Sequence, residues 1–310
     1  MSEAISLKDL KPEQVPERLR PSFYFDFKQY PFDHEELFRK KSVIDVIAGI
    51  SDYAKAWLKR KIDAAVALPG IVRKNEKDYP GRSYGRFIIL VEPGAAFEPT
   101  FVRGTDKPDA QPRTLCVSRG AKVLGVNVFL DEGDISIGEE TTIEPGVGIK
   151  GPSIIGKKNE IRMGAYFRGD CIVGDNCTLR GELKNTVLMN KANFPHPSYL
   201  GDSLCGFDTH FGNQATSANL GILAILSRDP IIIECDGKHY NLGRPKVGII
   251  MGDKSQVGCN SVSDPATFLG PWTICYQLTR LNKGFYGPNE ILKYKPMEHG
   301  VIERSPLRRK

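Results

Sequence analysis

A short stretch in the second half of the chain gathers side chains that are suited to acid–base chemistry and to binding a polar ligand. His196 opens the run His196-Pro197-Ser198-Tyr199-Leu200-Gly201-Asp202-Ser203, and His210 and Asn219 follow it. Imidazole gains and loses a proton near neutral pH, so histidine is the usual general acid or base. A single histidine in a loop can also be an ordinary polar surface residue, so its role depends on the elements that hold it.

Upstream of this stretch, one apolar residue returns every six positions: Ile137, Ile143, Ile149, Ile155, Ile161, Phe167, Val173 and Leu179. The fifth position of each unit is mostly small: Thr141, Val147, Ser153, Asn159, Ala165, Cys171 and Cys177. Neither a helix nor a simple alternating strand has this period. Hexapeptide repeats are typical of a parallel β-helix, in which each coil pairs with the coils above and below it.

The same period extends in both directions. It begins at Val117 and shifts by two residues near Asp134, which indicates a bulge or loop there. It resumes near Leu200 with Cys205, Phe211 and Ser217, and again from Met251 to Cys275. We therefore predict a mainly β fold with three parts: an N-terminal α/β or helical extension (1–114), a β-helix domain (115–280) and a C-terminal cap and tail (281–310).

Three features interrupt this plan. Ser42 and Asp45 have the spacing of a capping box before an apolar pattern of period three and four, which predicts an amphipathic helix at 42–61. The lapses in the six-residue period predict loop excursions at 185–198 and 220–246. The second contains Asp236-Gly237 between apolar runs, which predicts a β-hairpin.

Composition narrows the function classes. The chain has 310 residues, a formal net charge of +6 and seven cysteines without a C-x-x-C pair. The positive residues form no stripe interleaved with aromatics, so nucleic acid is a disfavoured partner. No signal peptide opens the chain and no apolar run reaches the length of a membrane span, so we expect a cytoplasmic protein that binds no membrane.

The motif around His196, together with Glu182-Leu183-Lys184-Asn185-Thr186 and Ala218-Asn219, resembles the acetyltransferase half of the bifunctional glucosamine-1-phosphate acetyltransferase/N-acetylglucosamine-1-phosphate uridyltransferases. It is also similar to the C-terminal domains of archaeal sugar-1-phosphate nucleotidylyltransferases. The resemblance covers about residues 143–275. It implies a left-handed β-helix, commonly a homotrimer, and acetyl transfer from acetyl-CoA to an amino-sugar phosphate or a nucleotide sugar.

The resemblance also implies roles for single residues. His196 has the place of the general base, Tyr199 that of a tyrosine that contacts substrate, and Asn219 that of an asparagine near the amino sugar. Arg168 and Lys184 have the places of cations that hold the sugar phosphate. Neither a metal nor any cofactor besides acetyl-CoA as co-substrate is expected.

Some positions depart from the family pattern. His210 stands where the family has an asparagine, and Gly212-Asn213-Gln214 replaces a glycine-alanine-glycine segment. The lysine expected shortly after Asn219 is absent from 220–225, and Arg228 or Lys238 are candidates to replace it. His210 is likewise a candidate for the missing polar contact with the acceptor.

Other functions stay open at this point. The missing lysine favours a non-catalytic protein that binds sugar nucleotides or sugar phosphates on the same scaffold. Residues 1–110 contain no Gly-rich loop that ends in arginine, which disfavours nucleotidyl transfer and a need for magnesium. A zinc enzyme of the β-helical carbonic anhydrase kind needs three converging histidines and ranks last, since only His196, His210 and His239 lie in or beside the repeats.

Overall fold

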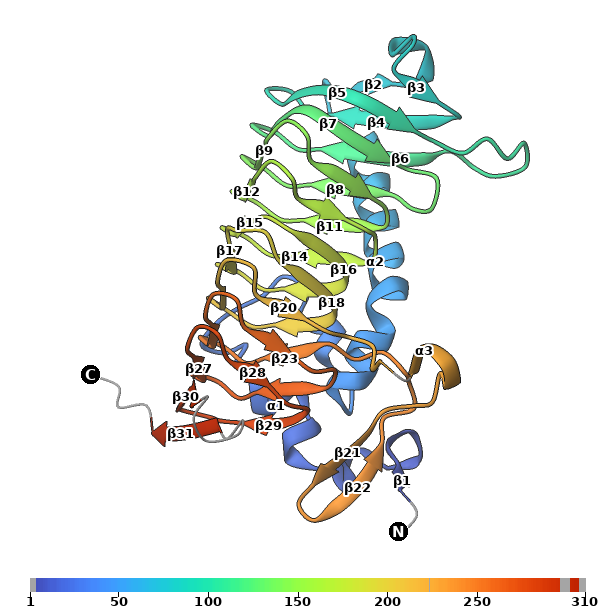
Figure 1. Ribbon diagram of the computed structural model, residues 1–310. Helices are drawn as coiled ribbons and strands as arrows, with labels where there is room; N and C mark the ends of the chain where they lie inside the picture. Colours follow the sequence, from blue (N-terminus) through green and yellow to red (C-terminus); the bar gives the residue numbers. More distant parts are fainter. Residues whose placement is uncertain (1–3, 223, 296–301, 307–310) are drawn as a thin grey trace. The chain divides into compact units, whose positions relative to one another are not determined.

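The chain forms two compact units, each built on a ladder of short parallel strands. The computed structural model describes residues 4–222, 224–295 and 302–306. One unit consists of residues 50–191, and the other of residues 1–49 and 192–310. The predicted fold class, mainly β with a left-handed parallel β-helix of hexapeptide repeats, is confirmed (Figure 1).

In the unit of residues 50–191 the strands are β2 (Val72–Lys74), β3 (Ser83–Tyr84), β4 (Phe87–Val91), β5 (Ala96–Arg103), β6 (Arg113–Val117), β7 (Lys122–Phe129), β8 (Ile135–Ile137), β9 (Thr142–Ile143), β10 (Gly148–Lys150), β11 (Ser153–Ile155), β12 (Glu160–Ile161), β13 (Tyr166–Phe167), β14 (Cys171–Val173), β15 (Thr178–Leu179) and β16 (Glu182–Leu188). From β3 onward these strands pair in parallel with one another. Among the described strands of this unit, only β2 pairs antiparallel, with β4.

The six-residue period fills the interior of this ladder. Ile143 pairs with Ile161, and Ile161 pairs with Leu179, so residues eighteen apart stack in adjacent coils. All eight apolar residues of the predicted register are at most 1% exposed. The small residues at the fifth positions are buried as well. No single coil could bury these side chains alone, so stacking provides the core.

The predicted irregularity near Asp134 is confirmed. Ile149 pairs with Val128, twenty-one residues away, whereas Ser153 pairs with Ile135, eighteen residues away. Three extra residues therefore leave the coil between β7 and β8. The backbone N–H of Thr114 donates to the Asp134 carboxylate at 2.7 Å, which ties the loop to the preceding coil.

The unit of residues 1–49 and 192–310 has a second ladder of β17 (Asn193–Phe194), β18 (Tyr199–Cys205), β19 (His210–Phe211), β20 (Thr216–Ser217), β23 (Ile249–Met251), β24 (Gln256–Val257), β25 (Val262–Ser263), β26 (Thr267–Leu269), β27 (Ile274–Cys275), β28 (Arg280–Leu281), β29 (Gly284–Tyr286) and β30 (Glu290–Tyr294), closed by β31 (Ile302–Pro306). Phe211 stacks on Val257, and Val257 on Cys275, so the predicted resumption of the period is confirmed.

Several predicted boundaries are wrong. Parallel pairing already joins β3 to β5 and β4 to β6, so the ladder begins near Ser83 rather than at residue 115. Pro99 lies inside β5, at a shift of register. Residues 185–198 are not a single excursion, because β16 continues to Leu188 and β17 follows. At the other end β29 and β30 continue the parallel ladder beyond residue 281.

The predicted helix is α2 (Val43–Val66), which ends five residues later than expected. Ser42 caps it, because its hydroxyl oxygen accepts from the Asp45 N–H at 3.1 Å and its O–H donates to the Asp45 carboxylate at 2.6 Å. Near its end Ala65 packs with Leu90 and Cys116 of the ladder. No helix among the described residues has both the length and the apolar composition required to cross a bilayer.

The second excursion folds as predicted around Asp236-Gly237. Strands β21 (Ile232–Cys235) and β22 (Lys238–Asn241) pair antiparallel, and both turn residues have positive φ, as a two-residue hairpin turn requires. A short helix, α3 (Ala224–Ser227), precedes the hairpin. Strand β1 (Ile5–Ser6) adds to the hairpin in parallel beside β22, so the N-terminal arm supports it.

This arm consists of short helical turns: η1 (Leu7–Asp9), η2 (Pro12–Gln14), η3 (Glu17–Leu19), α1 (Pro21–Tyr24) and η4 (Glu35–Phe38). Asp253, which is 3% exposed, anchors it to the ladder. One carboxylate oxygen accepts from the Asp26 N–H and the other from the Phe207 N–H, both at 2.8 Å. Burial raises the pKa of Asp253 to about 6, although these two N–H groups oppose the shift.

This shift predicts a pH dependence of stability. Because the folded pKa lies above the ordinary value of 3.8, the folded state binds more protons between about pH 4 and 6. The contribution of Asp253 is therefore present at pH 4 and lost as the pH rises through 6, by about 3 kcal/mol in the free energy of unfolding. Urea unfolding of native protein and Asp253→Asn at pH 4 and pH 7 measures it.

From pH 7 to pH 4, the free energy of unfolding of the native protein should rise by that amount relative to that of Asp253→Asn. Glu13→Gln, which removes an exposed carboxylate of the same arm, is the control and should follow the native curve. Parallel curves for native protein and Asp253→Asn would contradict the assignment.

Candidate functional site

Two histidines of the predicted site lie close together at one corner of the ladder in the unit of residues 1–49 and 192–310. His196 is exposed in the corner between β17 and β18. The Gln214 N–H donates to the Pro197 carbonyl at 2.8 Å, so this corner stacks on the next one. His210 begins β19, where it pairs with Asn193, three residues before His196.

The surroundings of His210 lower its pKa below the ordinary value of 6.5. Burial lowers its pKa, a hydrogen bond from its ring to the Asn193 backbone raises the pKa in part, and the charge of His196 lowers it further. The last effect requires that the two imidazoles lie within electrostatic reach of each other. A half-buried imidazole with a lowered pKa thus lies near an exposed one, and the exposed one is accessible to a ligand.

Tyr199 and Asn219 form a second group in the same unit. Tyr199 begins β18 and pairs with Thr216 of β20, two residues before Ala218-Asn219. Both side chains lie over the backbone of Gly201, since a Cβ at Gly201 would be 2.6 Å from the Tyr199 hydroxyl and 2.8 Å from the Asn219 Nδ2. Glycine at this position therefore lets the phenol and the amide approach each other.

Asp202 holds this group in place. Its Oδ2 accepts from Asn219 Nδ2 at 2.6 Å, and its Oδ1 accepts from Arg244 Nη2 at 2.9 Å. The Asp202 side chain is 5% exposed and that of Arg244 is 21% exposed. Burial lowers the pKa of Arg244, and the Asp202 carboxylate opposes that shift. The amide of Asn219 is therefore fixed by a buried charged pair that joins the ladder to the end of the 220–246 excursion.

Arg168 and Lys184 belong to the unit of residues 50–191 and lie next to each other there. Phe167 pairs with Leu183, and the Arg168 N–H donates to the Leu183 carbonyl, so the two cations follow on adjacent rungs. Arg168 Nη1 also donates to Glu182 Oε1 at 2.6 Å. Lys184 lies half-buried in β16. The structure thus brings together His196 with His210, Tyr199 with Asn219, and Arg168 with Lys184.

Reasoning from the sequence missed Arg244, although one signal pointed to it. An excursion that leaves the ladder after Asn219 must return close to the same coil, and Leu220 indeed bridges to Lys246. The residues just before the period resumes are therefore neighbours of Asn219. The cations proposed to replace the missing lysine lie elsewhere: Lys238 is exposed in the hairpin turn region and Arg228 is exposed after α3.

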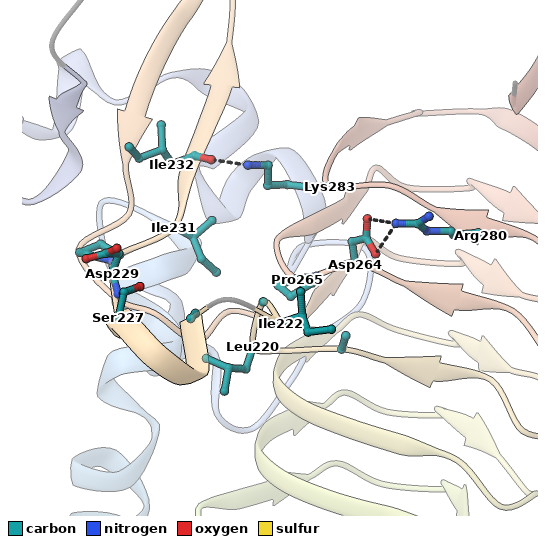
Figure 2. A pocket seen from close by; sticks show the side chains of 14 residues that line it. Leu220, Ile222, Ser227, Asp229, Ile231, Ile232, Asp264, Pro265, Arg280 and Lys283 are labelled. Carbon is teal, nitrogen blue, oxygen red and sulfur yellow. Dashed lines mark hydrogen bonds and ion pairs between the residues drawn. The ribbon is translucent and has the colours of Figure 1, made fainter. Parts of the chain in front are cut away.

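The segment of the expected lysine lines a pocket of about 760 Å³ in this unit (Figure 2). Leu223, within that segment, lies outside the described residues. Lys283 and Arg280 are the basic side chains of the pocket lining. Arg280 pairs with Asp264 at 3.2 Å, while Lys283 Nζ donates to the Ile232 carbonyl at 2.8 Å. Within the part of the chain that the structure describes, no group of three or more His, Cys, Asp and Glu side chains is arranged to hold a metal ion.

Comparisons with known proteins agree with the resemblance. The chain is 30% identical over 161 residues to a bifunctional sugar-1-phosphate nucleotidylyltransferase/acetyltransferase of Sulfurisphaera tokodaii, a match that covers 46% of this chain and 39% of that protein. The chain is similar to the bifunctional sugar nucleotidylyltransferase/acetyltransferases. A bifunctional protein GlmU of Nostoc sp. is 30% identical over 191 residues, which cover 59% of this chain and 33% of that protein.

The chain thus spans well under two thirds of the length of these curated relatives. No family model matches it. Among solved structures, a Francisella novicida UDP-N-acetylglucosamine acyltransferase aligns at 11% identity and a TM-score of 0.29 over 65% of this chain and 66% of that one. A polysialic acid O-acetyltransferase, OatWY, aligns at 16% identity and a TM-score of 0.31 over 71% of this chain and 84% of that one.

Proposed function

We propose that this protein is an acyltransferase that moves an acetyl group from acetyl-CoA to an amino-sugar phosphate or a nucleotide sugar. The observation that carries the proposal is its sequence similarity to a protein whose name combines nucleotidyl and acetyl transfer. The fold favours acetyl transfer over nucleotidyl transfer, because residues 83–294 supply the strands of the parallel ladder in both units. A nucleotidylyltransferase would instead need an α/β domain with a phosphate-binding loop.

In the proposed reaction the amine of the acceptor attacks the carbonyl carbon of the thioester. A nitrogen–carbon bond forms, the carbon–sulfur bond breaks, and His196 takes the proton that the amine loses. The sulfur leaves as the thiol of CoA once a proton returns to it. The exposed position of His196 allows this contact, and the lowered pKa of His210 disfavours a second positive charge beside it.

Thiol release from acetyl-CoA tests the proposal directly. Purified protein is incubated with acetyl-CoA and a panel of amino sugars, their 1-phosphates and their nucleotide derivatives. We expect release that depends on one class of acceptor. Release at the level of a protein-free control with every acceptor would contradict the proposal.

A second prediction concerns Arg168 and Lys184, the two cations in the unit of residues 50–191. If Arg168 and Lys184 hold the acceptor phosphate, Lys184→Met removes one charge-assisted hydrogen bond, of about 1.5–3 kcal/mol. The KM for a phosphorylated acceptor should then rise about 10- to 100-fold, while the KM for the unphosphorylated amino sugar stays near the native value. Steady-state kinetics with both acceptors measures this.

Lys157→Met is a matched control for this test, since it removes an exposed lysine of the same ladder. It should leave both KM values unchanged. An equal rise for both acceptors with Lys184→Met would show that the lysine does not recognise the phosphate.

A second candidate function is binding of sugar nucleotides or sugar phosphates without catalysis. It is favoured by the missing lysine after Asn219 and by Gly212-Asn213-Gln214 in place of the glycine-alanine-glycine segment. This candidate predicts that sugar nucleotides raise the melting temperature while no thiol is released with any acceptor. Assembly as a homotrimer is implied by the same resemblance, and sedimentation of the purified protein tests it.

A further inference from the structure

The pocket beside Asn219 has no part in the roles assigned so far. Its lining includes both sequence neighbours of Asn219, Ala218 and Leu220. Residues of the 220–246 excursion form one wall, and the coils that carry Asp264 and Lys283 form the other. In Figure 2, Asp264 and Arg280 lie across the opening from Ser227 and Asp229. All of its lining residues belong to one unit, the unit that also holds His196 and Tyr199.

The lining is mainly apolar. Five side chains give it this character: Leu220, Ile222, Ile231, Ile232 and Pro265. Both Ile222, which is 85% exposed, and Ile232, which is 42% exposed, line this pocket. Large apolar groups left open to solvent in a concave site are a common mark of ligand binding.

The pocket also offers a cation at its edge. Lys283 Nζ donates one hydrogen bond, to the neutral carbonyl of Ile232. An ammonium group has three donors, so two remain for a ligand carbonyl or anion. Arg280, in contrast, pairs with Asp264.

The wall made by the excursion is held in place at several points. The hairpin β21–β22 pairs with β1 of the N-terminal arm, and Lys283 ties Ile232 to the ladder. Leu220 and Lys246 close the base of the excursion by a bridge. The pocket is therefore formed before a ligand arrives, which reduces the entropic cost of binding.

We propose that this pocket binds the hydrocarbon part of the acyl donor, so that the protein accepts acyl groups longer than acetyl. The inference rests on the proposed function, because it takes a thioester as the ligand. An acetyl group has a single methyl group beyond its carbonyl and would leave most of the 760 Å³ unfilled. A linear acyl chain would cover Leu220, Ile222 and Ile231, with its carbonyl or the phosphates of CoA near Lys283.

Calorimetric titration with acetyl-CoA, butanoyl-CoA and hexanoyl-CoA, without any acceptor, tests this proposal. Complete burial of one methylene group tightens binding about fourfold. A methylene that is half buried in the pocket should tighten it about twofold. Hexanoyl-CoA has four more methylenes than acetyl-CoA and should bind about tenfold or more tightly. Equal affinities along the series would overturn the proposal.

A matched pair of variants locates the effect. Ile222 and Leu226 are each 85% exposed in the same segment, but only Ile222 lines the pocket. Ile222→Ser should lower the preference for hexanoyl-CoA about threefold or more, and Leu226→Ser should leave it unchanged. The same change in both variants would overturn the proposal. So would a concentration-dependent dimer of the native protein that Ile222→Ser abolishes, since a second copy would then cover the pocket.

The result separates this inference from the proposed function. Chain-length-dependent binding without thiol release for any acceptor would leave the pocket assigned and reject the transferase. Acetyl transfer with no dependence on chain length would support the transferase and reject the pocket.

Discussion

Replacement of His196 by asparagine is expected to lower kcat for acyl transfer by about 10²–10⁴-fold. A positioned general base contributes a factor of this size, because it removes the proton as the new bond forms. Asparagine keeps a polar side chain of similar size but takes up no proton. Since His196 is exposed at a corner of the ladder, the change should leave folding and the KM for acetyl-CoA close to native values.

His239→Asn is the matched control for this prediction. His239 is also exposed, lies in β22 of the hairpin and has no assigned role in the reaction. We expect its kcat to stay within about twofold of native, as exposed substitutions away from a site usually have small effects. If His196→Asn kept the native kcat, His196 could not be the base.

Asp202→Ala should destabilise the protein by about 3–5 kcal/mol. The substitution removes a buried carboxylate from Arg244, whose side chain is 21% exposed, and leaves a desolvated cation without this counter-ion. It also removes the acceptor of Asn219 Nδ2, so that the amide loses the contact that fixes it. Urea unfolding should show a lower midpoint with an unchanged slope.

Two further variants complete this test. Asp208→Ala breaks an ion pair with Lys254 that involves a 43% exposed carboxylate, and should cost about 1 kcal/mol or less. The double variant Asp202→Ala/Arg244→Met should recover part of the loss, since both charges are then gone. If Asp202→Ala were no more harmful than Asp208→Ala, the charged pair would not stabilise this coil.

Most of the fold follows from the sequence because the side chains of a β-helix repeat in space as they repeat in the chain. Ile143, Ile161 and Leu179 stack for the same reason that they are eighteen residues apart. The start of the ladder was harder to predict. Residues 83–114 pair in parallel although prolines interrupt them, and Pro99 fits only because β5 shifts register there.

The candidate site follows less completely. The motif places Tyr199 and Asn219 in adjacent coils, where both lie over Gly201. No sequence motif points to Arg244, because its contact with Asp202 depends on the path of the 27-residue excursion (220–246) and not on the six-residue repeat. The pocket has no sequence signal either, since Ile222 and Lys283 meet only through that path.

The central claim is that this β-helix transfers an acyl group with His196 as base, and one measurement tests it most directly. Acetyl-CoA with an isotopic label in its acetyl group is incubated with the amino-sugar acceptors and either the native protein or His196→Asn. Mass spectrometry then follows the label. The account predicts labelled amide on an amino sugar with the native protein, and a yield lower by about two orders of magnitude or more at equal time with the variant. Equal labelling by both proteins, or none above a protein-free control with the native protein, would contradict it.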